Sequence, residues 1–197
     1  AAGADSSGYL NSARLLASGH LGMELRSPPE FGPQEKLFRQ QFQPHGFAPF
    51  EGRERLSPTY AVGLPLHLAA ASLVLGWHTG PIAVGVGAAL AGVLLCYAVA
   101  RQLGVERPLA AAGAAALAAY PVYIYMSLQP LSDVLSAAWC LAAVAAALRS
   151  RERRAWALAC GAAFGVGVLV RSTNALLLPA LLVLLGADPR RLLLAVA

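Results

Sequence analysis

The sequence predicts an all-α protein: a polytopic bundle of transmembrane helices with a long exoplasmic first loop that contains short amphipathic or interfacial helices. Three observations support this fold class. The 197 residues are 57% hydrophobic and 13% charged, with a mean hydropathy of +0.58, and such a composition is typical of membrane proteins. Residues 81–100 are twenty uncharged residues, enough to cross an apolar core about 30 Å thick at about 1.5 Å per residue. Finally, the basic residues concentrate in alternate loops.

We expect residues 1–197 to be a single, partial transmembrane domain, because the chain lacks an initiator Met and its last residues resemble half of another apolar segment. Residues 1–58 carry six basic and six acidic residues and Pro-rich stretches, and are predicted to form the exoplasmic loop with a juxtamembrane helix. Residues 81–197 are predicted to hold transmembrane helices, the last one truncated. After residue 100 the expected apolar segments are 108–132, 134–148, 155–170 and 172–187.

Arginine content predicts the orientation of the bundle. The loops at 101–107, 149–154 and 188–191 are rich in Arg, whereas those at 127–133 and 171–174 hold one basic residue between them. Because Lys and Arg concentrate on the cytoplasmic side of membrane proteins, we expect the first set to be cytoplasmic and the second exoplasmic. The net charge of +5 is therefore attributed to topology. No nucleic-acid partner is expected, since that would require the basic residues on one soluble face.

The segment from residue 60 to residue 78 is ambiguous. Its apolar part is about 14 residues long, the length of an interfacial or re-entrant segment. We expect a helix that lies in the exoplasmic interface, which leaves residues 1–58 outside the cell. The alternative is an ordinary spanning helix followed by a tight turn at residues 78–81.

Asp5 precedes a helical pattern in which Tyr9, Ala13 and Leu16 share one face and Gly19 ends the helix. It is expected to be the N-cap and to accept hydrogen bonds from the first-turn N–H groups. It is also a carboxylate at the outer membrane surface, placed to accept a proton. The two roles are compatible, because a position at a helix N-terminus favours the ionised carboxylate.

Two further charged residues are candidates. Asp133 is the one formally charged residue between Pro108 and Leu148. An ionisable group at membrane depth is a functional candidate, although a position at a helix start would make Asp133 a simple cap. Arg171 is the lone cation on the predicted exoplasmic side of the bundle. It either reaches lipid headgroups or clamps a phosphate with its guanidinium.

Metal and nucleotide sites are not indicated by the sequence. The three cysteines lie in apolar runs without CxxC spacing, so neither a disulfide framework nor a zinc site is expected. His20, Glu24 and Glu30 could contribute to a metal site, but their spacing imposes no geometry. The glycines of the apolar segments are interpreted as helix-packing positions, and no Walker-type loop or GxSxG motif occurs.

The arrangement resembles the GT-C superfamily of integral-membrane glycosyltransferases, especially the branch with protein O-mannosyltransferases and lipid A aminoarabinose transferases. "ADSSGYLNSARLLASGH" is similar to the family's D-x-x-x-Y-x-x-x-A-x-x-x-x-x-G pattern at the start of the first exoplasmic loop, with Asp5 and Tyr9 in place. "SPTYAVGLPLHLAAASLVLG" resembles its membrane-lying segment, and "SLQPLSD" its second exoplasmic loop. "GVGVLVRSTNALLLPALLVLL" resembles its G-x-x-x-x-x-R-x-x-x-x-x-x-x-P signature.

The resemblance implies transfer of a sugar from a polyprenyl-phosphate donor to a lipid, glycan or protein acceptor at the exoplasmic face of a lipid bilayer, the bacterial inner membrane. Asp5 would be the general base of a single inverting displacement. Tyr9, Asp133 and Arg171 would bind substrate, with Arg171 stabilising the departing phosphate. No cofactor is implied beyond the lipid-linked donor, and a divalent metal is not indicated. Ser6 departs from the family, because many members have a second acid at that position.

Two other functions fit parts of the sequence. A transporter or flippase would line its route with intramembrane ionisable residues, and Asp133 could serve it, but Asp5 would then have no evident role. In a non-catalytic membrane scaffold, all three charged residues would be caps and anchors.

Overall fold

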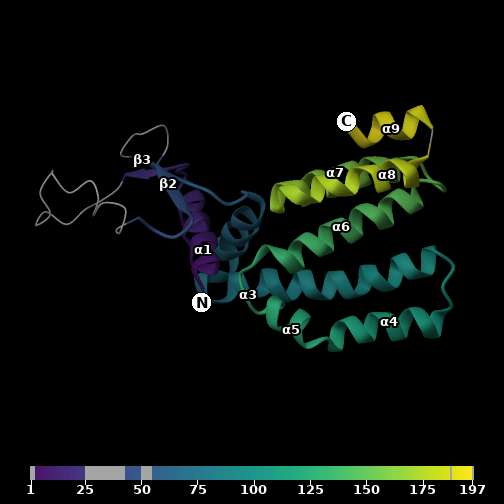
Figure 1. Cartoon of the computed structure of the whole chain (residues 1–197), viewed down its shortest axis with the longest axis horizontal. Helices are drawn as coiled ribbons and strands as arrows, with labels where there is room; N and C mark the ends of the chain where they lie inside the picture. Colours follow the sequence, from purple (N-terminus) through teal and green to yellow (C-terminus); the bar gives the residue numbers. More distant parts are fainter. Residues whose placement is uncertain (1–2, 25–42, 50–54, 187, 197) are drawn as a thin grey trace, which may run out of the picture.

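The computed structural model describes residues 3–24, 43–49, 55–186 and 188–196, and it confirms the helical fold predicted from the sequence (Figure 1). The apolar segments predicted at 134–148 and 155–170 correspond closely to two of its helices. The helices are α1 (Ala4–Ala17), α3 (Gly63–Gln102), α4 (Arg107–Ala119), α5 (Pro121–Ser127), α6 (Ser132–Arg149), α7 (Ala155–Val170), the 3₁₀ helix η2 (Ser172–Leu177), α8 (Leu178–Leu185) and α9 (Pro189–Val196).

Helix α3 consists of two pieces that meet at Gly76, where φ is 79° and ψ is 161°. A Cβ added at Gly80 would lie 2.7 Å from the Cα of Ser72. In a straight helix these positions would be separated by about 12 Å along the axis, so the chain bends sharply between them. The break therefore falls at Gly76, before the turn considered at residues 78–81, and Pro81 lies inside the second piece.

The piece of α3 before the kink, residues 63–75, would be about 20 Å long, shorter than an apolar core of about 30 Å. Leu66, Leu73 and Val74 on this piece are exposed, as lipid-facing side chains would be. The placement of residues 60–78 in the interface stays a prediction. The piece from 77 to 102 is about 39 Å long, sufficient for a complete span.

The apolar segment predicted from 108 to 132 is broken at Tyr120, whose backbone is extended where α4 ends and α5 begins. Pro121 causes the break, because proline disfavours the helical conformation in the residue before it. By length and composition α3 and α6 could each cross a membrane, and α4 with α5 would be a third span if this pair, bent by 60°, counts as one. The segment expected at 172–187 begins as η2 and continues as α8.

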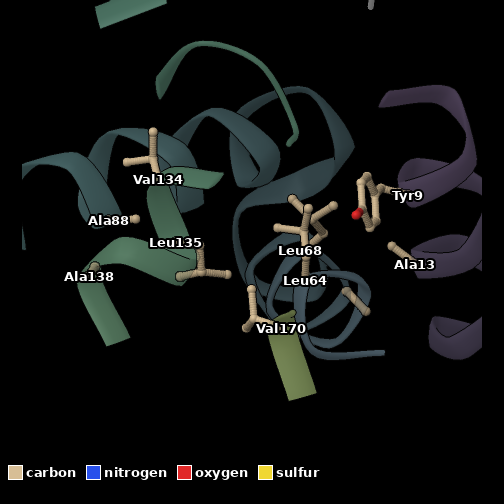
Figure 2. Packing of buried hydrophobic residues seen from close by; sticks show 10 residues of the cluster. Tyr9, Ala13, Leu64, Leu68, Ala88, Val134, Leu135, Ala138 and Val170 are labelled. Carbon is tan, nitrogen blue, oxygen red and sulfur yellow. The ribbon is translucent and has the colours of Figure 1, made fainter. Parts of the chain in front are cut away.

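The helices pack in the order α4, α3, α6, then α7 with α8, and α9 outermost (Figure 1). One buried cluster joins α1, α3, α6 and the end of α7 through side chains that include Leu64, Leu68 and Val170 (Figure 2). A second cluster lies between α6, α7 and α8 and consists largely of small side chains, with Ala143, Ala147 and Ala157 fully buried. Small side chains let helix backbones approach closely, which is how helices commonly associate in a membrane.

The polar region before α3 contains a small antiparallel sheet that the sequence does not predict. Its strands are β1 (Met23–Glu24), β2 (Phe47–Pro49) and β3 (Arg55–Pro58), in the order β1-β3-β2. Phe47 and Leu56 are buried within it. Strands of two to four residues are too short to produce a recognisable alternation of polar and apolar residues.

Charge is divided between the two ends of the bundle. The loops joining α3 to α4, α6 to α7 and α8 to α9 lie at the end away from α1 (Figure 1). Residues 101–107, 149–154 and 188–191, which form these loops and the adjoining helix ends, contain eight arginines and three acidic residues. The excess of five equals the formal net charge of the whole chain. Arg154 and Arg191 both contact Asp188 at 3.3 Å. We call this region the Arg-rich end.

Replacing Gly76 by Ala tests the origin of the kink in α3. The φ and ψ of Gly76 belong to a region that only glycine adopts readily, so Gly76→Ala should lower the free energy of unfolding by about 1–3 kcal/mol. Gly113→Ala in α4 is the matched control. A Cβ at Gly113 meets open space, so that change should stabilise by about 0.5–1 kcal/mol. Equilibrium unfolding in mixed micelles measures both. Equal stability of the two variants would contradict this account.

Candidate active site

Helix α1 holds the predicted base, Asp5, in its first turn. The N-cap is Gly3, and within the described residues Asp5 makes no capping hydrogen bond, so the expectation that Asp5 is the N-cap is wrong. The helix begins at Ala4, two residues earlier than a cap at Asp5 would allow. The Asp5 side chain is nevertheless at the N-terminal end of α1, where the helix dipole favours a negative charge, and it is exposed.

Tyr60, in the segment between β3 and α3, reaches the Asp5 carboxylate. Its phenol O–H donates a hydrogen bond of 2.6 Å to Asp5 Oδ1. The ring of Tyr60 also lies against that of Tyr9, with ring centroids 4.5 Å apart and planes tilted by 33°. The hydrogen bond to Asp5 is the main cause that raises the pKa of Tyr60 from 10.0 to about 12, with smaller contributions from burial and from the negative charge of Asp5.

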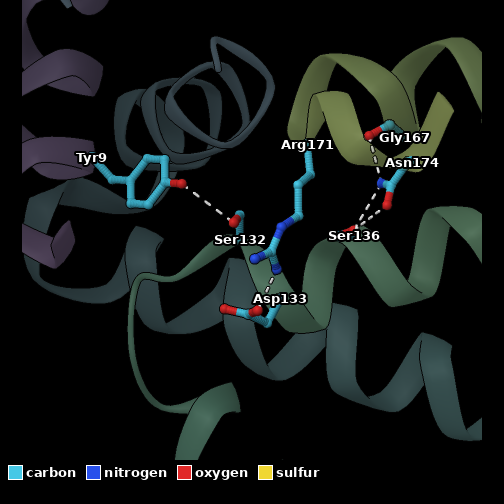
Figure 3. A network of polar contacts seen from close by, with 7 residues as sticks. All are labelled: Tyr9, Ser132, Asp133, Ser136, Gly167, Arg171 and Asn174. Atoms are coloured by element: carbon cyan, nitrogen blue, oxygen red, sulfur yellow. Dashed lines mark hydrogen bonds and ion pairs between the residues drawn. The ribbon is translucent and has the colours of Figure 1, made fainter. Parts of the chain in front are cut away.

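Tyr9 connects α1 to the start of α6. Its side chain is only 9% exposed, and its hydroxyl donates a hydrogen bond of 3.2 Å to Ser132 Oγ (Figure 3). Ser132 is the first residue of α6 and precedes Asp133. The contact therefore brings the helix that carries Asp5 to the end of α6 that carries Asp133. A substrate contact by Tyr9 stays a prediction.

Asp133 and Arg171 form an ion pair between the start of α6 and the end of α7. Arg171 Nη1 donates a hydrogen bond to Asp133 Oδ1 (Figure 3). Arg171 has an extended backbone where α7 ends, which turns its side chain back toward α6. Both side chains are 48% exposed, so Asp133 lies at the accessible end of the bundle. It occupies the first turn of α6 but makes no capping hydrogen bond among the described residues.

A polar network fixes the turn that presents Arg171. Asn174 Nδ2 donates hydrogen bonds to Ser136 Oγ at 2.7 Å and to the Gly167 carbonyl at 2.8 Å (Figure 3). The Asn174 backbone N–H donates to the Arg171 carbonyl at 3.0 Å. One amide thus connects α6, α7 and η2, next to the Asp133–Arg171 pair.

An apolar cavity of about 470 Å³ lies between the two pieces of α3 and α6. It is lined mostly by alanines, with His67 and Trp139 on its wall. Trp139 Nε1 donates a hydrogen bond of 3.2 Å to His67 Nε2, and His67 Nδ1 lies 2.7 Å from the Gly63 carbonyl. Because a carbonyl only accepts and Trp139 only donates, these contacts require the neutral His67 tautomer with its proton on Nδ1.

The metal residues considered from the sequence are not assembled in the described part of the chain. Glu30 lies outside the described residues. Within those residues no group of three or more His, Cys, Asp or Glu side chains is placed to hold a metal ion.

The sequence missed three residues of the site: Tyr60, Ser132 and Asn174. The contacts of Tyr60 and Ser132 join residues 55 and 123 positions apart, and neither has a local sequence signal. Together the site offers an exposed carboxylate next to a phenol donor, and a half-exposed guanidinium held by a second carboxylate. The first group can accept a proton, and the second can stabilise an anion.

Comparison with known families matches residues 66–196 to the sequence model described as dolichyl-phosphate-mannose-protein mannosyltransferase. The matched range covers two thirds of the chain and includes Asp133 and Arg171 but not Asp5, Tyr9 or Tyr60. No curated protein and no solved structure matches the chain.

The titration of Tyr60 tests the contact with Asp5. The pKa of Tyr60 is raised from 10.0 to about 12, so the contact should stabilise the fold fully below pH 10 and lose its effect as the pH rises through 12. In Asp5→Ala the pKa of Tyr60 should return toward 10. The difference in phenolate absorbance between each protein and its Tyr60→Phe version isolates this tyrosine. An unchanged pKa in Asp5→Ala would show that the contact does not form.

Proposed function

The chain belongs to the dolichyl-phosphate-mannose-protein mannosyltransferase family and is a membrane glycosyltransferase of the GT-C type; from this premise we propose that it transfers a sugar from a polyprenyl-phosphate donor to a hydroxyl acceptor. The name of the family supports mannose as the sugar and a protein as the acceptor. These are the first substrates to test, ahead of lipid and glycan acceptors.

The hydrogen bond from Tyr9 to Ser132 is the observation that carries this proposal. It joins α1, with its exposed carboxylate, to the residue before Asp133, whose partner is the Arg171 guanidinium. A glycosyl transfer from a lipid phosphate needs a base for the acceptor and a positive charge for the leaving phosphate. This end of the bundle supplies both from different helices.

In the proposed reaction, Asp5 accepts the proton of the acceptor hydroxyl as the hydroxyl oxygen bonds to the anomeric carbon of the sugar. The bond between that carbon and the phosphate oxygen breaks at the same time, and its electron pair leaves with the lipid phosphate. Attack comes from the face opposite the phosphate, so the anomeric configuration inverts. A positioned general base of this kind contributes about 10²–10⁴-fold in rate.

Arg171 has the role of stabilising the leaving phosphate. Its guanidinium has five N–H donors, of which Nη1 serves Asp133, so the remaining N–H groups can bind phosphate oxygens. Asp133 orients the guanidinium and the Asn174 network holds the turn behind it. Preorganised donors need little rearrangement as charge develops on the phosphate.

The apolar cavity between the pieces of α3 and α6 is the proposed place for the first units of the polyprenyl chain. Its alanine-rich wall suits a flexible hydrocarbon, since apolar contacts require no directed partner. The position of the Arg-rich end supports an exoplasmic site. Because Arg-rich loops concentrate in the cytoplasm, the opposite end, with Asp5 and Arg171, would face outward.

Asp5→Asn in the full-length protein should lower kcat for transfer from polyprenyl-phosphate mannose by about 10²–10⁴-fold, because the amide cannot accept the proton. Glu106→Gln makes the same chemical change at the exposed N-cap residue of α4, in the Arg-rich end, and should leave transfer unchanged. Initial rates with a labelled donor measure both. Undiminished transfer by Asp5→Asn would rule out Asp5 as the base.

Arg171→Ala should lower kcat by about 10²–10³-fold, as expected when a donor to a developing anion is removed. Its effect on the free energy of unfolding should stay within about 1 kcal/mol, because the ion pair with Asp133 is half-exposed. Arg153→Ala, on the exposed loop between α6 and α7, is the control. If Arg171→Ala lowered the free energy of unfolding by as much as it raised the activation free energy of transfer, Arg171 would instead be a structural residue.

A further inference from the structure

Tyr60 is held in a slot built from two other segments of the chain. A Cβ added at Gly8 of α1 would lie 2.3 Å from Tyr60 Cε2, and one added at Gly46 would lie 2.4 Å from the same atom. No side chain larger than hydrogen fits at either position without displacing the ring. Tyr9 covers the ring at a centroid distance of 4.5 Å. Gly8, Gly46 and Tyr9 therefore all contact the Tyr60 ring, which stays partly exposed.

The backbone next to Tyr60 is also fixed. The Thr59 N–H donates a hydrogen bond of 2.9 Å to the Gly46 carbonyl, which continues the pairing of β2 with β3. On the other side of Tyr60, Leu64 and Leu68 are buried in the core that α1 shares with α3. The backbone segment that carries Tyr60 is thus held at one end by the sheet and at the other by the helix bundle.

This anchoring strengthens the hydrogen bond from Tyr60 to Asp5, because less rotamer entropy is lost when the bond forms. An exposed hydrogen bond between two mobile side chains is weakened by competition with water and by the rotamer entropy that both side chains lose. The contacts with Gly8, Gly46 and Tyr9 already restrict the Tyr60 ring, so its hydroxyl loses less rotamer entropy when it binds Asp5. Asp5 can therefore be oriented although its own side chain is exposed.

We propose that Tyr60 is a positioning residue for Asp5, with its phenol O–H holding Oδ1 so that Oδ2 is directed at the acceptor hydroxyl. A carboxylate has two oxygens, and the structure commits one of them to Tyr60. The role rests on the proposed function, because it acts through Asp5 as the base. The proposal also gives the region before α3 a role in catalysis, since strand β3 of its sheet ends just before Tyr60.

Tyr60→Phe is the principal test, because phenylalanine keeps the ring in its slot and removes only the hydroxyl. In the full-length enzyme, kcat for transfer should fall by about 10- to 100-fold, the range expected for a misplaced catalytic group. KM for donor and acceptor should change by less than about 2-fold, because the loss is confined to the transition state. Tyr125→Phe, an exposed tyrosine of α5, is the matched control and should behave like wild type.

The double variant Asp5→Asn with Tyr60→Phe separates positioning from an independent effect. If Tyr60 acts through Asp5, adding Tyr60→Phe to the Asp5→Asn variant should cause no further loss of kcat. Multiplicative losses would overturn the proposal, because Tyr60 would then act on the substrate or on the fold.

Gly8→Ala provides a second variant that keeps the phenol. Alanine favours the helix, but its methyl group would push the Tyr60 ring out of the slot. It should therefore lower kcat and return the pKa of Tyr60 toward 10. If the wild-type enzyme transfers the sugar and Tyr60→Phe has the same kcat, the positioning role alone is overturned. No transfer by the wild-type enzyme would overturn the proposed function, and the positioning role with it.

Discussion

Tyr9 and Ala13 of α1 pack against Leu64 and Leu68 at the start of α3 (Figure 2), and the positions of the candidate catalytic groups depend on this contact. Of the apolar residues of α1, these two are the buried ones, and Leu10 and Ala17 pack beside them against the same cluster. One turn of helix separates Tyr9 from Asp5. The packing that buries Tyr9 therefore sets the location of the carboxylate, and its hydroxyl sets the distance from α1 to α6.

The rigidity of the site comes from the way the helices behind it are packed. Helices α6 and α7 meet through alanines and Cys160, with Ala143, Ala147 and Ala157 fully buried. In a membrane no hydrophobic force drives one apolar helix toward another, so close contact of small side chains and polar links between helices must hold them. Asn174 is such a link, joining α6, α7 and η2. Asp133 and Arg171 thus stand on helices that cannot easily separate.

The features that could be predicted from the sequence depend on local patterns. The helix bundle could be predicted from long apolar segments, and its two ends from the Arg-rich loops. Each apolar segment and each loop is a run of no more than about twenty-five neighbouring residues. The contacts of the site are of another kind. Asp133 and Arg171 could each be identified as candidates from the sequence. Their pairing depends on the extended backbone of Arg171, which the local sequence does not predict. The same holds for Tyr60, whose slot is formed by Gly8 and Gly46 from separate segments. The kink at Gly76 was obscured by Pro81, a stronger break signal that the second piece of α3 accommodates near its beginning.

The unequal distribution of charge between the ends of the bundle has an electrical consequence. The net charge of +5 equals the excess of arginines at the Arg-rich end, whereas the charges of the rest of the sequence, which includes Asp5, Asp133 and Arg171, sum to zero. Across a membrane potential of about 100 mV, negative on the Arg-rich side, moving five charges to the other face would cost roughly 12 kcal/mol. The potential that an energised cell maintains would thus resist inversion of the bundle, and the charge that provides this resistance lies away from Asp133 and Arg171.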